Sequence, residues 1–109
     1  MATEPPKDTP FKPSELAAFD GTDSSKPIYV AIKGIVYDVT KKPEMYGAGS
    51  GYNCFAGKDA SKALGKSSLS PEDCVADYSS LDEKEMETLN GWVKFFQQRY
   101  NIVGKVVDE

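Results

Sequence analysis

The sequence contains no histidine. This absence excludes a Ser–His–Asp or Cys–His catalytic unit, a zinc site with histidine ligands and a haem held by histidine. The acidic residues also provide no carboxylate pair suited to acid–base catalysis. Any chemistry of this chain must therefore use other side chains or a bound cofactor.

Arginine is almost as scarce, because Arg99 is the only one. The chain has 13 basic and 17 acidic residues, a net charge of −4. Nucleic-acid binding needs clustered Lys and Arg, so we expect no nucleic-acid partner. The acidic run of Glu83, Glu85 and Glu87 is most simply a solvated face at the start of a helix, with a partner contact as the alternative.

Cysteines and long apolar stretches are few as well. Cys54 and Cys74 form no CxxC pattern, and no stretch approaches the roughly 18 apolar residues of a membrane span. Residues 1–10, MATEPPKDTP, are polar and rich in proline, unlike a signal peptide. We therefore expect an intracellular, cytoplasmic chain with reduced thiols, in which Cys54 is a small core residue.

What is present fits one domain. The length of 109 residues allows a single modest core. Residues 1–10 are predicted to be a disordered tail, and residues 11–107 the folded domain. The order of the expected elements lacks βαβ repetition and indicates an α+β fold. These elements are a helix from Pro13, a hairpin of 28–33 and 35–39 around Lys33-Gly34, short helices capped by Thr40, Asp59 (closed by Gly65) and Ser70, a long helix from Asp82, and a strand over 102–107.

The long helix has the strongest signals. Asp82 and Glu85 have the spacing of a capping box. Apolar residues then recur at intervals of three and four, which predicts one continuous buried face. They are Met86, Leu89, Val93, Phe96 and Tyr100.

Residues 46–57, YGAGSGYNCFAG, combine four glycines with two tyrosines. A nucleotide-binding loop is disfavoured because no Gly-Lys-Ser/Thr ending follows. Two interpretations stay open. The segment is either a flexible loop, or a place where glycines let the backbone approach a flat ligand that Tyr46 and Tyr52 face.

The tyrosines separate by context. Tyr29 and Tyr37 lie in the predicted hairpin, where packing in the sheet explains them. Tyr46 and Tyr52 stand on the glycine-rich segment, and Tyr100 ends the long helix beside Arg99. A deprotonated phenol is a hard anionic ligand for ferric iron, so tyrosine is the plausible axial haem ligand in a chain without histidine.

Several segments together resemble the membrane-associated progesterone receptor family, a cytochrome b5-like group that binds haem and steroids. The similarity extends over residues 11–107, and FAGKDAS is its most specific motif. The shortness of the chain resembles the soluble steroid-binding members of plants. The matching segments are IKGIVYDV at 32–39, MYG at 45–47, FAGKDAS at 55–61, LNGW at 89–92, and RY and VGK at 99–100 and 103–105.

The resemblance implies a cytochrome b5-like fold, with helices framing a ligand pocket against a small sheet. It also implies that Tyr52 is the axial ligand of the haem iron, and that Tyr46, Arg99 and Tyr100 line the pocket. Arg99 stands where lysine is more usual and keeps the positive charge. We expect these pocket residues to lie at least partly outside the packed interior.

The function implied is a non-enzymatic module that binds ferric haem b through a tyrosinate and acts in sterol metabolism or cytochrome P450 regulation. The alternative is a protein that takes a steroid directly in an apolar groove. Electron transfer as in cytochrome b5 is disfavoured by the missing histidines, and an adaptor without a ligand is a further possibility. Expected partners are haem, steroid, and cytochromes P450 or other sterol-pathway proteins, and a homodimer stays open. Through such partners the chain would associate peripherally with the endoplasmic reticulum.

Overall fold

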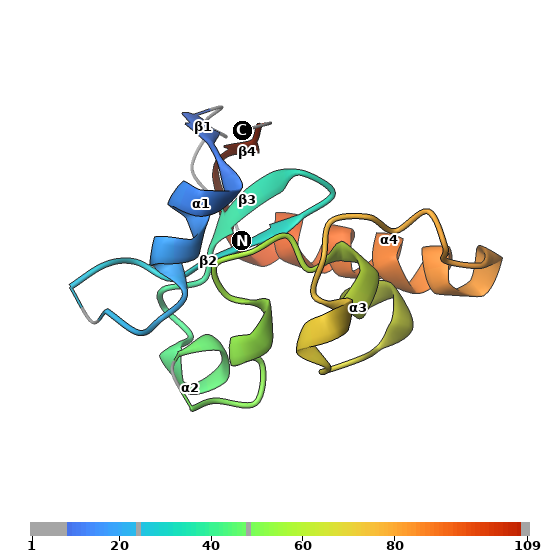
Figure 1. Cartoon of the computed structure of the whole chain (residues 1–109), viewed down its shortest axis with the longest axis horizontal. Helices are drawn as coiled ribbons and strands as arrows, with labels where there is room; N and C mark the ends of the chain where they lie inside the picture. The colour runs from blue at the N-terminus through green and yellow to red at the C-terminus, as the bar shows by residue number, and fades with distance from the viewer. Residues whose placement is uncertain (1–8, 24, 48, 108–109) are drawn as a thin grey trace.

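The computed structural model describes residues 9–23, 25–47 and 49–107. A four-stranded sheet carries helices on both faces, which confirms the predicted α+β class (Figure 1). The elements are, in chain order, β1 Thr9–Phe11, α1 Pro13–Leu16, η1 Ala17–Phe19, β2 Tyr29–Ile32, β3 Ile35–Asp38, α2 Pro43–Tyr46, η2 Asn53–Phe55, α3 Ser61–Lys66, η3 Pro71–Asp73, α4 Glu83–Arg99 and β4 Asn101–Val106.

The strands lie in the order β1-β4-β3-β2. β3 is antiparallel to β2 and β4, and β1 runs parallel to β4 with Thr9 opposite Gly104. The prediction of a disordered tail is therefore wrong for Thr9 and Pro10, while residues 1–8 lie outside the described part of the chain. Pro10 is compatible with this strand because an edge strand does not need every N–H for the sheet.

The predicted hairpin is confirmed, with β2 and β3 paired in the register Val30 to Tyr37. Its two turn residues both have positive φ angles, 52° at Lys33 and 80° at Gly34. This is the geometry of a type I′ turn, whose twist matches that of the strands. Gly34 adopts it without steric cost.

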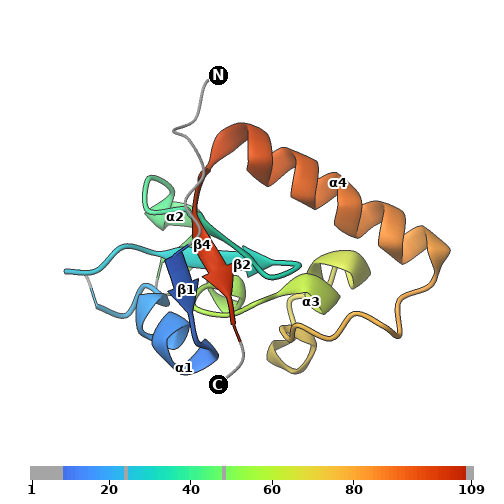
Figure 2. The same ribbon diagram turned by 90° about the horizontal axis from the view of Figure 1, so that it is seen from above.

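Successive residues of the hairpin enter two separate cores. Val30 and Tyr37 belong to the larger core, and Ala31 and Val36 to the smaller one. The period of two sends alternate side chains to opposite faces. Figure 2 shows α4 on one side of the sheet and α1 on the other. Tyr37 is fully buried, as expected, whereas Tyr29 is half-buried and stacks on Phe19 at a centroid distance of 4.6 Å.

Helix α4 follows its prediction closely. The Asp82 carboxylate accepts from the Glu85 N–H at 2.8 Å, and the Glu85 carboxylate accepts from the Asp82 N–H at 3.0 Å. Leu89 and Phe96 are completely buried in the larger core, and the other three residues of the predicted face also pack there. The helix ends where Tyr100 turns extended and leads into β4.

The short helices differ from their predictions in their caps. Thr40 does not cap α2, since its hydroxyl oxygen accepts from the Ile28 N–H at 3.0 Å instead. Gly65 lies inside α3, and Ser67 is the residue in the left-handed conformation. A Cβ at Gly65 would collide with the side chain of Leu81. Close packing therefore explains this glycine. The helix expected at Ser70 is a single 3-10 turn, η3.

Candidate functional site

Three of the four predicted site residues form one aromatic cluster. The ring of Tyr46 lies 5.9 Å from that of Tyr52 and 6.3 Å from that of Tyr100, measured between centroids. Tyr46 ends α2, Tyr52 precedes η2, and Tyr100 caps α4. Elements far apart in the sequence thus bring three phenol groups to one place. We call Tyr46, Tyr52 and Tyr100 the tyrosine cluster.

The three members differ in exposure. Tyr46 is 2% exposed and Tyr100 8% exposed, while Tyr52 is half-buried. The expectation that the pocket tyrosines lie partly outside the packed interior is therefore wrong for Tyr46 and Tyr100. Both rings pack against Phe96, which is itself completely buried beneath α4. Tyr52 is the most exposed member of the tyrosine cluster.

Burial also opposes the ionisation of Tyr46. Burial is the largest cause that raises the pKa of Tyr46 above its ordinary value. The charge of Tyr100, a hydrogen bond with Tyr100 and the charge of Tyr52 raise this pKa further. A phenol in this position keeps its proton at neutral pH. Tyr46 is therefore a neutral hydrogen-bonding group within the cluster.

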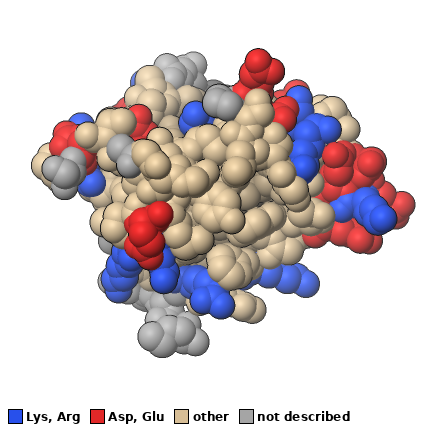
Figure 3. All heavy atoms as spheres, turned by 90° about the horizontal axis from the view of Figure 1, so that it is seen from below, with Lys and Arg blue, Asp and Glu red and all other residues tan. Residues whose placement is uncertain are grey.

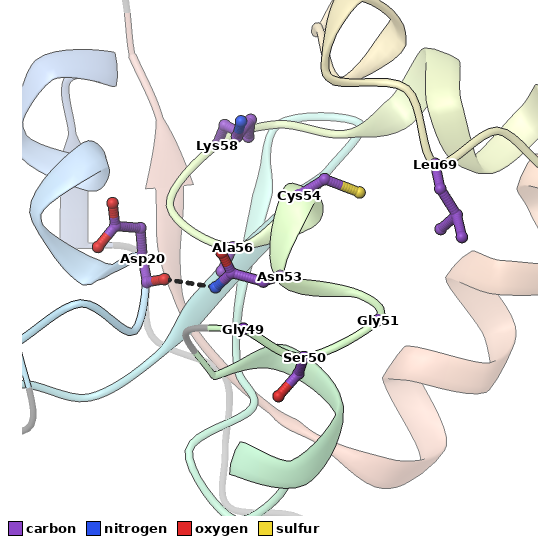
Figure 4. Close-up of a pocket in the computed structure, with 9 residues that line it drawn as sticks. All are labelled: Asp20, Gly49, Ser50, Gly51, Asn53, Cys54, Ala56, Lys58 and Leu69. Atoms are coloured by element: carbon purple, nitrogen blue, oxygen red, sulfur yellow. Dashed lines mark hydrogen bonds between the residues drawn. The ribbon is translucent and has the colours of Figure 1, made fainter.

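Backbone and side-chain hydrogen bonds hold the loop that carries Tyr52. The Tyr52 N–H donates to the Met45 carbonyl at 2.9 Å. The Asn53 amide nitrogen donates to the Asp20 carbonyl at 2.9 Å (Figure 4) and to the Tyr46 carbonyl, also at 2.9 Å. Since a side-chain amide has two N–H donors, Asn53 uses both to join the ends of η1 and α2 to η2. These hydrogen bonds thus restrain the segment around η2, contrary to the interpretation of a flexible loop.

Sequence reasoning missed Asn53, because nothing in a single sequence shows that its partners lie 33 and 7 positions away. It named Phe55 only as the first residue of FAGKDAS and did not predict that its ring stacks on Tyr52, at 5.7 Å with an interplanar angle of 14°. Trp92 belongs to the LNGW motif, and its ring contacts Phe96, which in turn packs against the tyrosine cluster. The apolar spacing of α4 was the signal that could have placed Trp92 beside Phe96.

Arg99 is exposed, as expected, and its side chain lies over the ring of Phe95. Its guanidinium lies 4.5 Å from the centroid of the Phe95 ring. Arg99 and Tyr100 both line a cleft of about 300 Å³, together with Met45. The cleft therefore joins a positive charge, a phenol and apolar groups at the edge of the tyrosine cluster. Its lining residues are Lys42, Met45, Phe95, Gln98, Arg99 and Tyr100.

A second cleft, of about 450 Å³, borders the glycine-rich segment (Figure 4). Gly49, Ser50 and Gly51 form one rim, and Leu69 stands opposite them. Leu69 is 54% exposed. The face of the molecule that carries α2 and η2 is largely uncharged, with the charged side chains gathered toward its edges (Figure 3).

The FAGKDAS segment has a structural role in this fold. The Asp59 carboxylate accepts from the Gly34 N–H at 2.9 Å, and the Ser61 hydroxyl oxygen accepts from the Lys33 N–H at 2.7 Å. Both bonds reach the hairpin turn between β2 and β3. Asp59 precedes α3 but is not its N-cap residue, which is Ala60.

Among the described residues, no group of three His, Cys, Asp or Glu side chains could hold a metal ion. None of the helices in that part of the chain is long and apolar enough to span a bilayer.

Comparison with known proteins places residues 12–106 in the family described as cytochrome b5-like haem/steroid-binding domain. The probable steroid-binding protein 3 of Arabidopsis thaliana is 53% identical over 97 residues, which are 89% of this chain and 97% of that protein. Membrane steroid-binding protein 1 of rice is 47% identical over 84% of this chain, and the match spans only 40% of the rice protein. A regulator of cytochrome P450 from Schizosaccharomyces pombe, dap1, is 37% identical over 98% of this chain and 70% of its own length. These relatives bear names of binding or regulatory proteins, and none of the three names describes an enzyme.

Solved structures agree with the fold. A solution structure from Arabidopsis, described as that of a putative steroid-binding protein, has a TM-score of 0.85 and 51% identity, and covers 92% of this chain and 98% of its own. Another Arabidopsis protein, described as having a cytochrome b5 like fold, has a TM-score of 0.84 and 48% identity, over 98% of this chain and 99% of its own. The cytochrome b5-like architecture expected from the sequence is confirmed.

Proposed function

The chain belongs to the family of cytochrome b5-like haem/steroid-binding domains, and we propose that it is a non-enzymatic module that binds ferric haem b through the phenolate of Tyr52. The observation that carries this proposal is the position of Tyr52. It is the one half-buried member of a cluster whose other two phenols are buried, in a chain without histidine.

The chemistry of the available donors fits a ferric haem. A phenolate oxygen is a hard anionic ligand, of the kind that tyrosine supplies to haem iron elsewhere. Phe55 stacks on the Tyr52 ring and restricts its orientation. The exposed guanidinium of Arg99 is suited to pair with a carboxylate such as a haem propionate.

Each residue of the site has a distinct task in this proposal. Tyr52 gives up its phenolic proton and offers the oxygen as a ligand. Tyr46 keeps its proton, because burial raises its pKa, and orients the phenol of Tyr100 by hydrogen bonding. Asn53 holds the loop so that Tyr52 stays beside Tyr46. When bound, a ferric haem supplies the positive charge that lets a phenol ionise at neutral pH.

We further propose that the module acts in sterol metabolism with cytochromes P450 as partners. The support is the fission-yeast relative, which is named a cytochrome P450 regulator, and the plant relatives, which are named steroid-binding proteins. A hard anionic ligand favours ferric over ferrous iron. Tyr52 therefore suits haem handling or regulation better than rapid electron transfer.

Direct binding of a steroid is the second candidate function. The names of the plant relatives favour it, and so does the largely uncharged face that carries α2 and η2 (Figure 3). The cleft lined by Met45, Phe95 and Tyr100 has a volume of about 300 Å³, at the lower end of ordinary ligand pockets. The two functions make opposite predictions for Tyr52, since a steroid needs no phenolate.

The test is a hemin titration followed by absorbance spectroscopy. The wild-type protein should show the charge-transfer band of phenolate-bound ferric haem, and Tyr52→Phe should abolish it. Tyr29→Phe is the matched control, because Tyr29 packs against the smaller core on the other face of the sheet. An unchanged spectrum and affinity in Tyr52→Phe would refute the ligand assignment. Steroid binding that persists in this variant would favour the second function.

A further inference from the structure

Helix α4 has an outer face that no other described element covers. Figure 2 shows the helix along the outside of the molecule, with the rest of the described fold on its inner side. Phe95 is 37% exposed on the outer face, and Thr88 and Gly91 are exposed beside it. These residues border a hollow of about 300 Å³, which is lined by Thr88, Gly91, Trp92 and Phe95. The outer face of α4 is thus largely apolar at its centre, as the centre of a protein interface is.

Gly91 lies in the middle of this outer face. At about 100° per residue, it is on the side of the helix opposite the buried residues Leu89 and Phe96. A Cβ at Gly91 would meet no described atom within 4 Å outside the backbone of its own helix. Packing within the chain therefore does not require this glycine, unlike Gly65, although glycine is a poor residue for the interior of a helix. A glycine at such a place lets the backbone of another molecule approach closely.

The charges around Gly91 are complementary to a second copy of the same helix. Glu87 and Lys94 are both exposed, and the helical repeat places them on the same side of Gly91, at nearly equal distances before and after it. Neither makes an ion pair within the part of the chain that the structure describes. If two α4 helices pack antiparallel with Gly91 at their crossing, Glu87 of each copy faces Lys94 of the other. A parallel arrangement would bring like charges together instead.

We propose that the outer face of α4 is the interface of a homodimer, in which two α4 helices pack antiparallel about a two-fold axis at Gly91. On one side of the axis, Phe95 of each copy packs beside Thr88 of the other. On the other side, Glu87 and Lys94 form two reciprocal ion pairs. Because each copy uses the same surface, the contact closes after two copies.

The size of the contact predicts how the dimer behaves. One helix face is smaller than a standard stable interface, so the dimer forms in concentrated solution and dissociates in dilute solution. Measurements on dilute protein therefore report the monomer. The contact needs no haem and does not include Tyr52, so its test is independent of the proposed function.

The test is sedimentation equilibrium of the wild-type protein without added haem, at low ionic strength and up to about 1 mM, a range that reaches weak interfaces. The weight-average mass should rise with concentration from 11.9 kDa toward twice that value. Added salt should weaken the association, because it screens the ion pairs. A protein that stays monomeric throughout would overturn the proposal and leave this face to a different protein, and growth beyond a dimer would contradict a closed contact.

Charge reversals test the antiparallel pairing. Glu87→Lys and Lys94→Glu should each weaken self-association about tenfold, because each replaces both reciprocal ion pairs with like-charge contacts. An equimolar mixture of the two variants should associate again, since the two basic groups of one variant face the two acidic groups of the other. Glu44→Lys, at an exposed position on α2, is the control for the change in net charge and should associate like wild type. A mixture that stays monomeric would show that the dimer uses another surface.

Gly91→Ala separates the dimer from the fold. Alanine is a better helix former, and its methyl group has open space in the monomer, so the melting temperature of dilute protein should rise. In the dimer the same methyl group keeps the two helices apart, so self-association should weaken. Tighter association of Gly91→Ala than of wild type would contradict a close approach of the two helices at this residue.

Discussion

The backbone N–H of Gly34 donates a hydrogen bond of 2.9 Å to the carboxylate of Asp59, 25 positions further along the chain. The same carboxylate accepts from the Ser61 N–H at 3.0 Å, and the Ser61 hydroxyl in turn accepts from the Lys33 N–H. The most specific motif of the sequence therefore fastens the β2–β3 turn to the start of α3. Asp59 and Ser61 thus hold the fold, whereas Phe55, the first residue of the same motif, stacks on Tyr52.

Asp59→Ala should accordingly reduce stability and leave ligand affinity nearly unchanged. Loss of charge-assisted hydrogen bonds to part-buried groups should lower the free energy of unfolding by about 2–4 kcal/mol. Urea melts and hemin titrations on the same samples measure both effects. Asp77→Ala is the control, because the Asp77 carboxylate bonds only locally to Ser79 on an exposed loop, and its effect should stay near about 0.5 kcal/mol. A hemin affinity that collapses in folded Asp59→Ala would place this residue in the site.

Asn53→Asp should loosen the loop that carries Tyr52. The substitution keeps the shape but replaces two N–H donors with a carboxylate facing the Tyr46 and Asp20 carbonyls. We expect unfolding to become easier by about 2–4 kcal/mol at neutral pH, together with weaker hemin binding. The difference from wild type should shrink below about pH 4, because a protonated carboxyl can donate again.

The matched control for this prediction is Asn90→Asp. The Asn90 side chain accepts a hydrogen bond from the Lys33 ammonium at 3.1 Å, and a carboxylate can accept the same bond. Asn90→Asp should therefore leave the free energy of unfolding nearly unchanged. Equal destabilisation by Asn53→Asp and Asn90→Asp would show that the two hydrogen bonds donated by Asn53 do not stabilise the loop.

Arg99→Ala should weaken ligand binding more than it weakens the fold. Arg99 is exposed and stacks on Phe95, so we expect an effect on unfolding of no more than about 1 kcal/mol. Loss of a charge-assisted hydrogen bond to a carboxylate corresponds to about 1.5–3 kcal/mol, or one to two decades in hemin affinity. Lys94 is an exposed cation on the same helix, and Lys94→Ala should change neither the free energy of unfolding nor the hemin affinity. An Arg99→Ala protein that melts like a core variant but titrates like wild type would make Arg99 a structural residue.

Reduction should weaken haem binding. Ferrous iron has less preference for an anionic oxygen donor, so dithionite added to the hemin complex should release haem or change its coordination. Absorbance spectra recorded before and after reduction, with a haem-accepting protein present in excess, measure the release. Tighter retention of ferrous than of ferric haem would be incompatible with a tyrosinate ligand.

The sequence alone determined the elements that depend on local signals. The capping box and the apolar spacing define α4, and Lys33-Gly34 defines the hairpin, because both patterns act between residues a few positions apart. The absence of histidine directed attention to the tyrosines, and the family motifs gave the correct fold. The boundary of the tail was wrong because β1 is a three-residue strand that exists only by pairing with β4.

Only the tertiary structure decided which residues meet. It brought Tyr46, Tyr52 and Tyr100 together and joined Asn53 to two distant carbonyls. It also buried Tyr46 and Tyr100, leaving Tyr52 as the accessible phenol. Such contacts depend on how helices pack against the sheet, and packing joins residues by position in space, which local sequence patterns do not encode.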